Sequence, residues 1–383
     1  MIFRLAKIIT ILVVLSALCI VVYLQHPLFG ALPHGDRLAR IEHSSNQSGG
    51  TFSNQIDTPM LTTDESQVSL MLNNAFTSTG QPTPPGAIPI VKTDLNALDV
   101  SQDLVIWLGH SSFYVQLAGR RILIDPVFST NASPVPMTNV AFEGSSVYTA
   151  DDMPEIDFLL ISHDHYDHLD YPSILALQPK VRQVVAPLGV GAHFEAWGYD
   201  MRRVQEADWY ETIGRAPDLQ IHVTPARHFS GRTFTKDKSL WAGFALVSKQ
   251  HRLFFSGDSG YAPHFAEIAR RYGPFDWVTL DTGQYDPRWA NVHMNPEQAA
   301  QAAEDLRAHV LMPGHVGRFS IAPHDWDDPF KRIVTASRGR SYTLWTPEIG
   351  QPAYLDGQAQ VFTPWWEAVR SDAAQKVTND HES

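Results

Sequence analysis

Short apolar runs separated by polar turns fill the chain from about residue 101 onward. Each run has the length of a strand and is bounded by glycine, proline or polar residues, a pattern typical of buried strands. We predict strands at residues 104–108, 113–117, 121–125, 158–162, 183–187, 221–225, 244–248, 253–258, 277–281 and 310–315.

Helical patterns lie between some of these strands. The clearest covers residues 295–308, where Asn295 is a good N-cap and Pro296 suits the first helical position. Alanines and one leucine then recur on a single face of this segment. Strands alternating with helices predict an α/β body in which two sheets pack together and helices cover the outside.

The N-terminal 26 residues follow another pattern. An apolar run of 17 residues, Ile8 to Leu24, comes after Arg4 and Lys7. This length is short for a membrane span but long for the core of a signal peptide. No small-x-small cleavage site follows, so we expect an uncleaved single-pass anchor, with a cleaved signal peptide as the alternative. The positive charges predict a cytoplasmic N-terminus and an extracytoplasmic body, which is periplasmic if the source is bacterial.

Composition divides the rest of the chain. Residues 27–100 are rich in Ser, Asn, Gly, Pro and Thr, and we interpret them as an extended arm or linker that drapes over the body. The strand-rich segment, residues 101–350, is expected to form the main domain, followed by a C-terminal extension over residues 351–383.

Net charge and cysteine content argue against one kind of partner and two kinds of site. The chain has 383 residues, a formal net charge of −12 and no basic stripe, which argues against a nucleic-acid partner. Its single cysteine, Cys19, lies in the N-terminal apolar run, so neither a disulfide framework nor a thiolate metal site is expected. Any transition metal would therefore be held by histidine and carboxylate.

A dense polar motif follows the predicted strand at 158–162. The segment ISHDHYDHLD, residues 161–170, has the spacing H-x-H-x-D-H. Other predicted strands also end in a histidine or aspartate beside glycine or proline, so that four strand ends deliver His163, His228, Asp258 and His315. Clustered histidines in an apolar setting repel one another when charged and lack hydrogen bonds when neutral, and a metal resolves both problems. The alternative is a solvated, histidine-rich turn.

The motif and its context resemble a known family. H-x-H-x-D-H followed by a distant His, an Asp in GD and a His in GH is the pattern of the metallo-β-lactamase superfamily. The segments WLGHSSFYVQLAGRRILIDPVFS, HDHYDHLD, TPARHFSGR, FFSGDSGY, GPFDWVTLDTGQYDPRWANVHMNPEQA and MPGHVGRF are similar to those of the N-acyl-phosphatidylethanolamine-hydrolysing phospholipase D family and its bacterial relatives. The likeness spans about residues 101–330, and more weakly FGALPHGDRLARI. It implies a four-layer αββα sandwich over residues 101–350. The transmembrane helix expected before this body rests on the apolar run alone, because the animal members of that family have no such N-terminal span.

Carried over by position, the resemblance implies a site with two zinc ions per chain. One ion would be held by His163, His165 and His228. The other would be held by Asp167, His168 and His315, and Asp258 would bridge the two. Nitrogen and oxygen ligands suit zinc, although they suit iron or manganese as well.

Further residues are expected around this site. Asp125 is a candidate to orient a ligand imidazole, or else a turn aspartate. His110 is either a pocket residue beside the ligands or a packed core histidine. His293 matches a family histidine near the substrate phosphate, and Arg288 is a second candidate for that contact. His264 is expected at the surface.

These expectations predict a membrane-anchored hydrolase. Two close metals would lower the pKa of a bridging water and stabilise a phosphodiester during attack, with Asp258 and Asp167 in the catalytic machinery and His293 steadying the phosphate. We expect a small-molecule or lipid phosphodiester as the substrate. Two alternatives stay open, namely a lactonase or amide hydrolase on the same site and a non-catalytic metal-binding protein. The oligomeric state is left undetermined.

Overall fold

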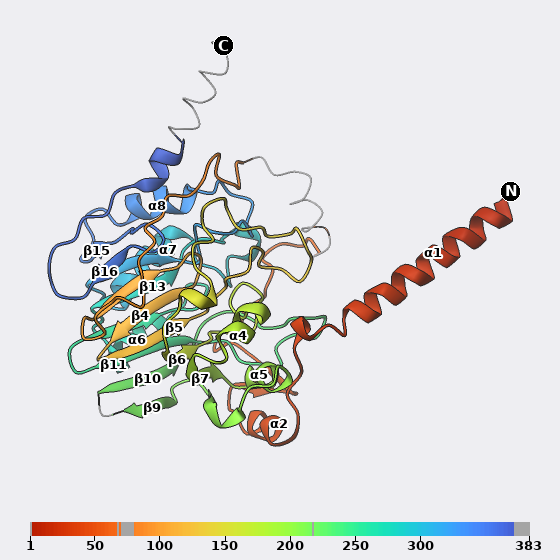
Figure 1. The fold of residues 1–383 in the computed structure, drawn as a ribbon, viewed down its shortest axis with the longest axis horizontal. Helices are drawn as coiled ribbons and strands as arrows, with labels where there is room; N and C mark the ends of the chain where they lie inside the picture. Colours follow the sequence, from red (N-terminus) through yellow and green to blue (C-terminus); the bar gives the residue numbers. More distant parts are fainter. Residues whose placement is uncertain (1, 67–68, 70–79, 217, 371–383) are drawn as a thin grey trace, which may run out of the picture.

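Two mixed sheets form the body of the protein. The computed structural model describes residues 2–66, 69, 80–216 and 218–370. Within these residues, two seven-stranded sheets pack face to face between two layers of helices (Figure 1). The predicted four-layer αββα sandwich is confirmed.

The first sheet contains the strands of the N-terminal half and one late strand. Its spatial order is β16 (Pro352–Tyr354), β3 (Leu104–Trp107), β4 (Phe113–Leu117), β5 (Arg120–Ile124), β6 (Ile156–Leu160), β7 (Val181–Pro187) and β8 (Val204–Ala207). The pairs from β16 to β5 are antiparallel, and those from β5 to β8 are parallel.

The second sheet repeats this arrangement. Its order is β15 (Thr343–Leu344), β14 (Val310–Gly314), β13 (Trp277–Asp281), β12 (Arg252–Phe255), β11 (Gly243–Ser248), β10 (Leu219–Thr224) and β9 (Thr212–Ala216). Strands β12 to β15 are parallel, and β11 is antiparallel to both of its neighbours. Because β10, β12, β13 and β14 therefore run in one direction, their carboxyl ends meet at one edge of the sheet.

Helices cover the outer faces of both sheets. Apolar residues of α4 (Tyr171–Leu177) and α5 (Gly191–Ala196) pack against the first sheet. Those of α6 (His264–Tyr272), α7 (Pro296–Asp305) and α8 (Asp328–Ala336) pack against the second. The helix predicted at 295–308 is α7, and Asn295 caps it in a reciprocal capping box with Gln298.

Aromatic side chains fill the core between the sheets. Phe255 on β12 packs edge-to-face on Phe113 of β4, with 5.6 Å between ring centroids, and lies 5.1 Å from the ring of Trp277 on β13. All three side chains are buried. This cluster links the sheets at their centre.

Replacing Phe255 with alanine is expected to lower the free energy of unfolding by about 3–5 kcal/mol, because the change removes a buried ring and leaves a cavity. Chemical denaturation followed by tryptophan fluorescence measures the effect. Phe234→Ala is the matched control, since Phe234 is exposed and its loss should change the stability by less than about 0.5 kcal/mol. Equal effects for the two variants would contradict the assignment of Phe255 to the core.

The structure corrects the expected end of the main domain. The boundary predicted at residue 350 is wrong for the sheet, because β16 follows it and pairs with β3. Strands β8, β9, β15 and β16 were not predicted. They are the edge strands of the two sheets, and their sequences are short or mixed with polar residues, so they lack a continuous apolar run.

The N-terminal arm lies against the body. It contains α2 (Gly35–Glu42) and a small hairpin of β1 (Gln47–Ser48) and β2 (Thr51–Phe52). Ile41, Phe52 and Ile88 are buried in the core between the sheets. Short 3-10 turns cover Pro27–Phe29, Ala150–Asp152, Met201–Arg203 and Pro287–Trp289. The expectation of a draped segment is consistent with these contacts.

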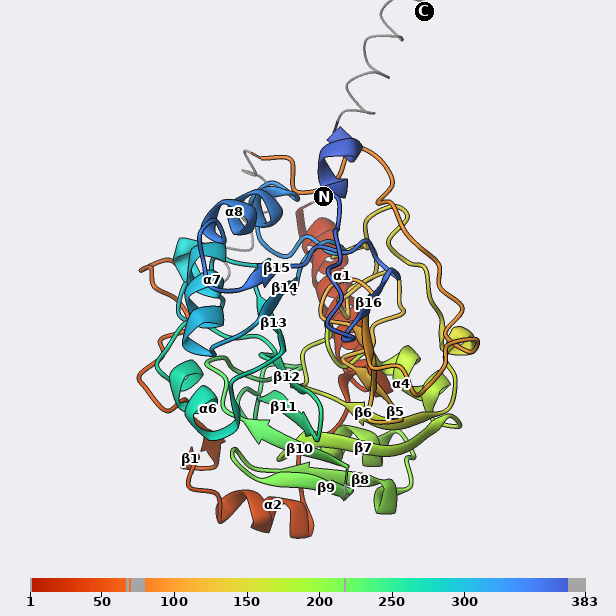
Figure 2. The same ribbon diagram turned by 90° about the vertical axis from the view of Figure 1, so that its left-hand side faces the viewer.

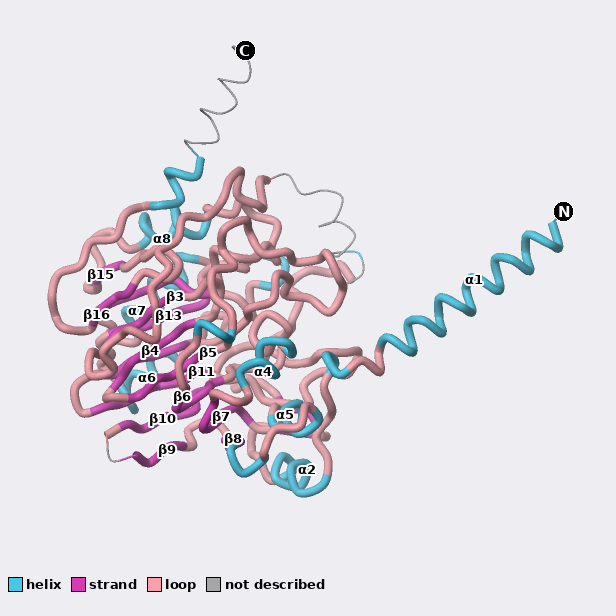
Figure 3. The backbone as a smooth tube through the Cα atoms, viewed as in Figure 1, coloured by secondary structure: helices cyan, strands magenta, loops and turns pink. Residues whose placement is uncertain are grey.

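Helix α1 (Ile2–Tyr23) stands apart from the body in Figure 1 and lies behind the body in the view of Figure 2. Among the described residues, one helix is long and apolar enough to cross a membrane, and it covers Phe3–Tyr23 within α1 with none of its span buried. The loops of the body gather on the side from which α1 leaves (Figure 3).

Candidate metal centre

The predicted ligands meet at the carboxyl ends of strands from both sheets. His163 follows β6 in the first sheet, and His228, Asp258 and His315 follow β10, β12 and β14 in the second. The carboxyl ends of parallel strands lie at one edge of a sheet, and the face-to-face packing of the two sheets brings these edges together. The site is thus built from segments more than 150 residues apart in sequence.

Buried hydrogen bonds hold the loop that carries the H-x-H-x-D-H motif. Asp125, at the end of β5, accepts hydrogen bonds from the Ser162 amide (2.7 Å) and hydroxyl (2.6 Å). The same carboxylate accepts from Nδ1 of His168 (2.8 Å), the contact expected of it. This bond sets the imidazole orientation and points Nε2 of His168 into the site.

Four of the predicted side chains form one group of possible ligands, namely His163, His165, His228 and Asp258. Nδ1 of His165 lies 2.9 Å from Nε2 of His163 and 3.2 Å from Nε2 of His228. Oδ2 of Asp258 lies 3.8 Å and 3.7 Å from the same two Nε2 atoms. Three nitrogen atoms and one oxygen atom therefore converge on a single point.

A second group is formed by Asp167, His168, His315 and His110. Nε2 of His168 lies 3.5 Å from Oδ2 of Asp167. Nε2 of His110 lies 2.9 Å from the same oxygen, so His110 is a buried hydrogen-bond partner of Asp167. The structure places His110 beside the predicted ligands rather than in the apolar core.

Asp258 faces both groups at once. Its Oδ2 points to His163 and His228, whereas Oδ1 lies 3.1 Å from Nε2 of His168 and 3.2 Å from Nδ1 of His315. Among the described residues, neither Oδ1 of Asp258 nor Nε2 of His168 has a hydrogen-bond partner, although both atoms are buried. A buried polar atom without a partner is costly, and a cation between these atoms would satisfy both. The donor set therefore fits two adjacent divalent metal ions.

The electrostatics of the groups favour metal binding. Burial lowers the pKa of His163 well below its ordinary value, and neighbouring histidines lower it further. Burial also lowers the pKa of His165, to about 4. Burial opposes the charged form of His168 too, but Asp258 and Asp167 outweigh it and raise the pKa of His168 well above its ordinary value. A lowered pKa favours the neutral imidazole, which offers a lone pair to a cation.

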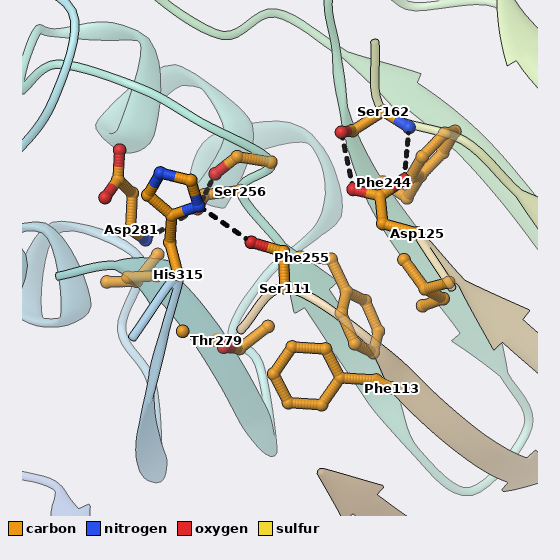
Figure 4. A pocket seen from close by; sticks show the side chains of 14 residues that line it. Ser111, Phe113, Asp125, Ser162, Phe244, Phe255, Ser256, Thr279, Asp281 and His315 are labelled. Carbon is orange, nitrogen blue, oxygen red and sulfur yellow. Dashed lines mark hydrogen bonds between the residues drawn. The ribbon is translucent and has the colours of Figure 1, made fainter. Parts of the chain in front are cut away.

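Figure 4 shows the floor of the site between the two sheets. The hydroxyl of Ser111 lies 3.0 Å from Nδ1 of His315, and Asp125 is hydrogen-bonded to Ser162 on the other side of the same pocket. The same pocket is lined by apolar side chains, with Phe113 below Ser111 in the view and Phe244 beside Ser162 and Asp125. Polar groups that position histidines thus lie directly on the apolar core.

His293 borders both groups, whereas Arg288 is engaged elsewhere. The ring of His293 stacks on His315 at a centroid distance of 5.2 Å and an angle of 4°. Its Nδ1 lies 2.8 Å from Oδ2 of Asp281, which outweighs the effect of burial and raises the pKa of His293. Arg288 forms a bidentate ion pair with Asp286, through Nε (2.7 Å) and Nη2 (2.9 Å). A contact between Arg288 and the substrate would have to compete with that carboxylate.

Sequence reasoning missed several positioning residues. Asp281 ends β13 and was overlooked, although its place at a strand end is the same pattern that identified Asp258. The hydroxyl of Ser162 contacts Nδ1 of His163, and the hydroxyl of Ser111 contacts Nδ1 of His315. Nothing in the local sequence distinguishes these two serines from others. The expectation of a surface location for His264 is wrong, because this side chain is buried and lies 3.3 Å from the Ser259 hydroxyl.

The other aspartates of the motif have structural tasks. Asp170 is the N-cap of α4 and accepts from the Ser173 amide. Asp164 points away from the ligand groups and accepts from the Gly231 amide (2.7 Å) and the Ser239 hydroxyl (2.8 Å). The motif therefore combines metal-binding geometry with two anchors of its own loop.

Comparisons with known proteins agree with this geometry. A family model described as a beta-lactamase superfamily domain matches residues 120–316. An uncharacterized protein of Mycobacterium tuberculosis is 35% identical over 329 residues, which cover 85% of this chain and 88% of that protein. The N-acyl-phosphatidylethanolamine-hydrolyzing phospholipase D 1 of Caenorhabditis elegans is 31% identical over 253 residues, 60% of this chain and 69% of that protein. These matches confirm the resemblance predicted from the motifs.

A solved structure shares the fold. Igni18, a metallo hydrolase from Ignicoccus hospitalis, aligns with a TM-score of 0.52 and 23% identity, covering 67% of this chain and 99% of that one. At this identity the likeness concerns the fold alone.

Proposed function

Because the chain belongs to the metallo-β-lactamase superfamily of metal-dependent hydrolases, we propose that it is a zinc-dependent phosphodiesterase of phospholipase D type. The observation that carries the proposal is the placement of Asp258 between two groups of histidine and carboxylate ligands. Paired metal sites of this kind serve phosphoester hydrolysis. The C. elegans relative supports N-acyl-phosphatidylethanolamine-like lipids as the substrate class.

The proposed ligand assignment follows the two groups. His163, His165 and His228 would hold one zinc ion, Asp167, His168 and His315 would hold the other, and Asp258 faces both groups. When bound, two zinc ions activate water and stabilise negative charge on phosphate oxygens. His110 orients Asp167 and Asp125 orients His168, so that the ligands are preorganised.

His293 is proposed to hold the phosphate. Its Nδ1 donates to Asp281, which fixes the ring plane and leaves Nε2 for an oxygen of the substrate. Asp281 is itself buried, and its Oδ2 also accepts a hydrogen bond from the Ser259 amide (3.2 Å), so the group that orients the imidazole is fixed in place. No serine nucleophile or covalent intermediate is needed for this reaction.

We propose that α1 anchors the protein in a membrane with the body on the extracytoplasmic side. The helix is apolar and unburied, and Arg4 and Lys7 precede the run. A membrane anchor suits an enzyme whose substrate is a lipid. Cell fractionation with protease access from either side tests the topology.

A substrate panel tests the proposed reaction. The full-length protein with zinc is offered N-acyl-phosphatidylethanolamine in vesicles, bis(p-nitrophenyl) phosphate, a lactone and a β-lactam. Release of phosphatidic acid from the lipid, with slower turnover of the carbonyl substrates, supports the proposal. Turnover of only the lactone or lactam would replace it with carbonyl chemistry, and turnover of none with a full zinc content would favour a metal-binding protein without hydrolase activity.

Replacing His293 with glutamine is expected to lower kcat for phosphodiesters by about 10²-fold, because one donor to the phosphate is lost. The zinc content should stay at about two per chain, since other residues supply the ligands. His309→Gln is the matched control, because His309 is exposed outside the site. Loss of zinc from the His293 variant would instead make His293 a ligand and contradict its proposed role.

A further inference from the structure

The segment after α1 is fastened to the loop that carries the metal motif, residues 163–169, called here the metal loop. The buried guanidinium of Arg232 donates from Nη2 to the carbonyl of Leu28 (2.7 Å). It donates from Nη1 to the carbonyls of Asp164 (2.7 Å) and Leu169 (2.8 Å), which lie at the two ends of the metal loop. One side chain thus joins the segment that follows α1 to the candidate metal centre.

Other contacts strengthen this junction. The indole of Trp197 donates to the carbonyl of Pro27 (2.7 Å), and the amide of Ala31 donates to Nδ1 of His193 (3.1 Å). Nε2 of His193 lies 3.3 Å from Oδ2 of Asp164. Because residues 27–31 are bound at several points, the metal loop has a fixed place next to the root of α1, defined here as residues 23–29.

Two loops flank this root. The hairpin 130–141 is closed by backbone bonds between Thr130 and Ala141 and between Ala132 and Asn139, and the hydroxyl of Tyr23 donates to its Pro134 carbonyl. The loop 230–237 is closed by a bond from the Asp237 amide to the Ser230 carbonyl. One cavity, of about 290 Å³, is lined by residues of the root, the hairpin and the metal loop. Another, of about 110 Å³, is lined by residues of the root and of the loop 230–237.

Both flanking loops expose apolar side chains at their tips. Outside α1, the three most exposed large apolar side chains of the described residues are Met137 (89%), Phe234 (89%) and Val361 (91%). Met137 lies at the tip of the hairpin, beside the half-exposed Val135, and Phe234 lies at the tip of the loop 230–237. Exposure of this degree is unfavourable in water but suits a lipid interface.

We propose that Val135, Met137 and Phe234 form a docking surface for the phospholipid bilayer that α1 enters. The position of α1 selects the bilayer as the partner. The root of this apolar helix lines one cavity with the hairpin 130–141 and another with the loop 230–237, and α1 leaves the body from this root (Figure 1). Insertion of the tips holds the body against the membrane and presents the metal loop to the lipid surface. The docking itself does not depend on the substrate, whereas delivery of a lipid to the site rests on the proposed function.

Site-specific fluorescence tests the docking without any assay of activity. Cys19, the single cysteine, is replaced by alanine in the full-length chain, and Met137→Cys, Phe234→Cys or Val361→Cys then carries an environment-sensitive label. After reconstitution into phosphatidylcholine vesicles, brominated lipids should quench the labels at 137 and 234 several-fold more than the label at 361. Val361 is the matched control because it is equally exposed and follows β16, a strand on the side of the body away from α1 (Figure 1). Equal quenching at the three positions overturns the inference.

Kinetics of charge variants separate the docking from the proposed function. In the full-length protein, the double variant Met137→Asp with Phe234→Asp should turn over a vesicle lipid about tenfold more slowly and bis(p-nitrophenyl) phosphate at an unchanged rate. Val361→Asp should change neither rate. Selective quenching without turnover of any lipid would support the docking and contradict the proposed substrate, whereas equal loss on both substrates would overturn the docking role of these side chains.

Discussion

Replacing Asp258 with asparagine is expected to lower hydrolase activity by at least about 10³-fold, because bound metals contribute several kcal/mol of charge stabilisation. Both carboxylate oxygens of Asp258 are needed, since Oδ2 faces His163 and His228 while Oδ1 faces His168 and His315. A neutral amide offers one weak oxygen and cannot contact two cations. Elemental analysis should find about one metal ion per chain or fewer in the variant.

The fold should tolerate this change. Burial opposes the charge of Asp258 and raises the pKa of its carboxyl to about 6, so a neutral amide of the same shape costs the metal-free protein little. The metal-free variant should therefore unfold close to the temperature of the metal-free parent. Asp356→Asn is the matched control, because Asp356 is exposed and makes a local turn bond. Normal metal content together with normal activity in the Asp258 variant would contradict the two-metal arrangement.

Removing the metals by chelation is expected to abolish hydrolysis and to lower Tm by about 5 °C or more, because a ligand bound only by the native state stabilises it. The stabilisation arises where the buried atoms of His168 and Asp258 lack hydrogen-bond partners among the described residues. Differential scanning calorimetry before and after treatment with a chelator measures the shift. Added zinc should restore both Tm and activity.

The chelation experiment has an internal control and identifies the metal. Asp258→Asn should show a smaller shift of Tm, since its site is already damaged. Restoration by manganese or iron but not by zinc would change the proposed cofactor and leave the ligand set in place. An unchanged Tm with full activity after complete chelation would remove the basis for a metal centre.

The candidate ligand residues and the fold family could be identified from sequence because both are encoded locally. His163, His165, Asp167 and His168 lie within one short motif, and each of the later candidates directly follows an apolar run. Buried parallel strands are continuous apolar segments, and their ends are marked by the first polar residue. Helix α7 was similarly predictable from its cap and its first proline.

The grouping of these residues and their support were decided by tertiary structure. Three residues that orient candidate ligands or His293 were not predicted, namely Ser162, Ser111 and Asp281. Ser111 and Asp281 contact histidines that are 204 and 12 residues away in sequence, and Ser162 contacts the adjacent His163. No local sequence pattern reports such contacts. β16 carries too few residues for a recognisable strand and exists because the edge of β3 offers hydrogen bonds. The burial of His264 also depends on tertiary structure, because this residue begins α6 and that helix packs on the second sheet.

The place of α1 relative to the candidate metal centre also followed from tertiary contacts. By itself, the sequence determined that an apolar helix precedes the body and that histidines and aspartates gather at strand ends, because composition and period are local properties. Only the folded chain brings Arg232 to Leu28 and to both ends of the metal loop. These partners are far apart in sequence, and their meeting depends on the packing of the whole sandwich.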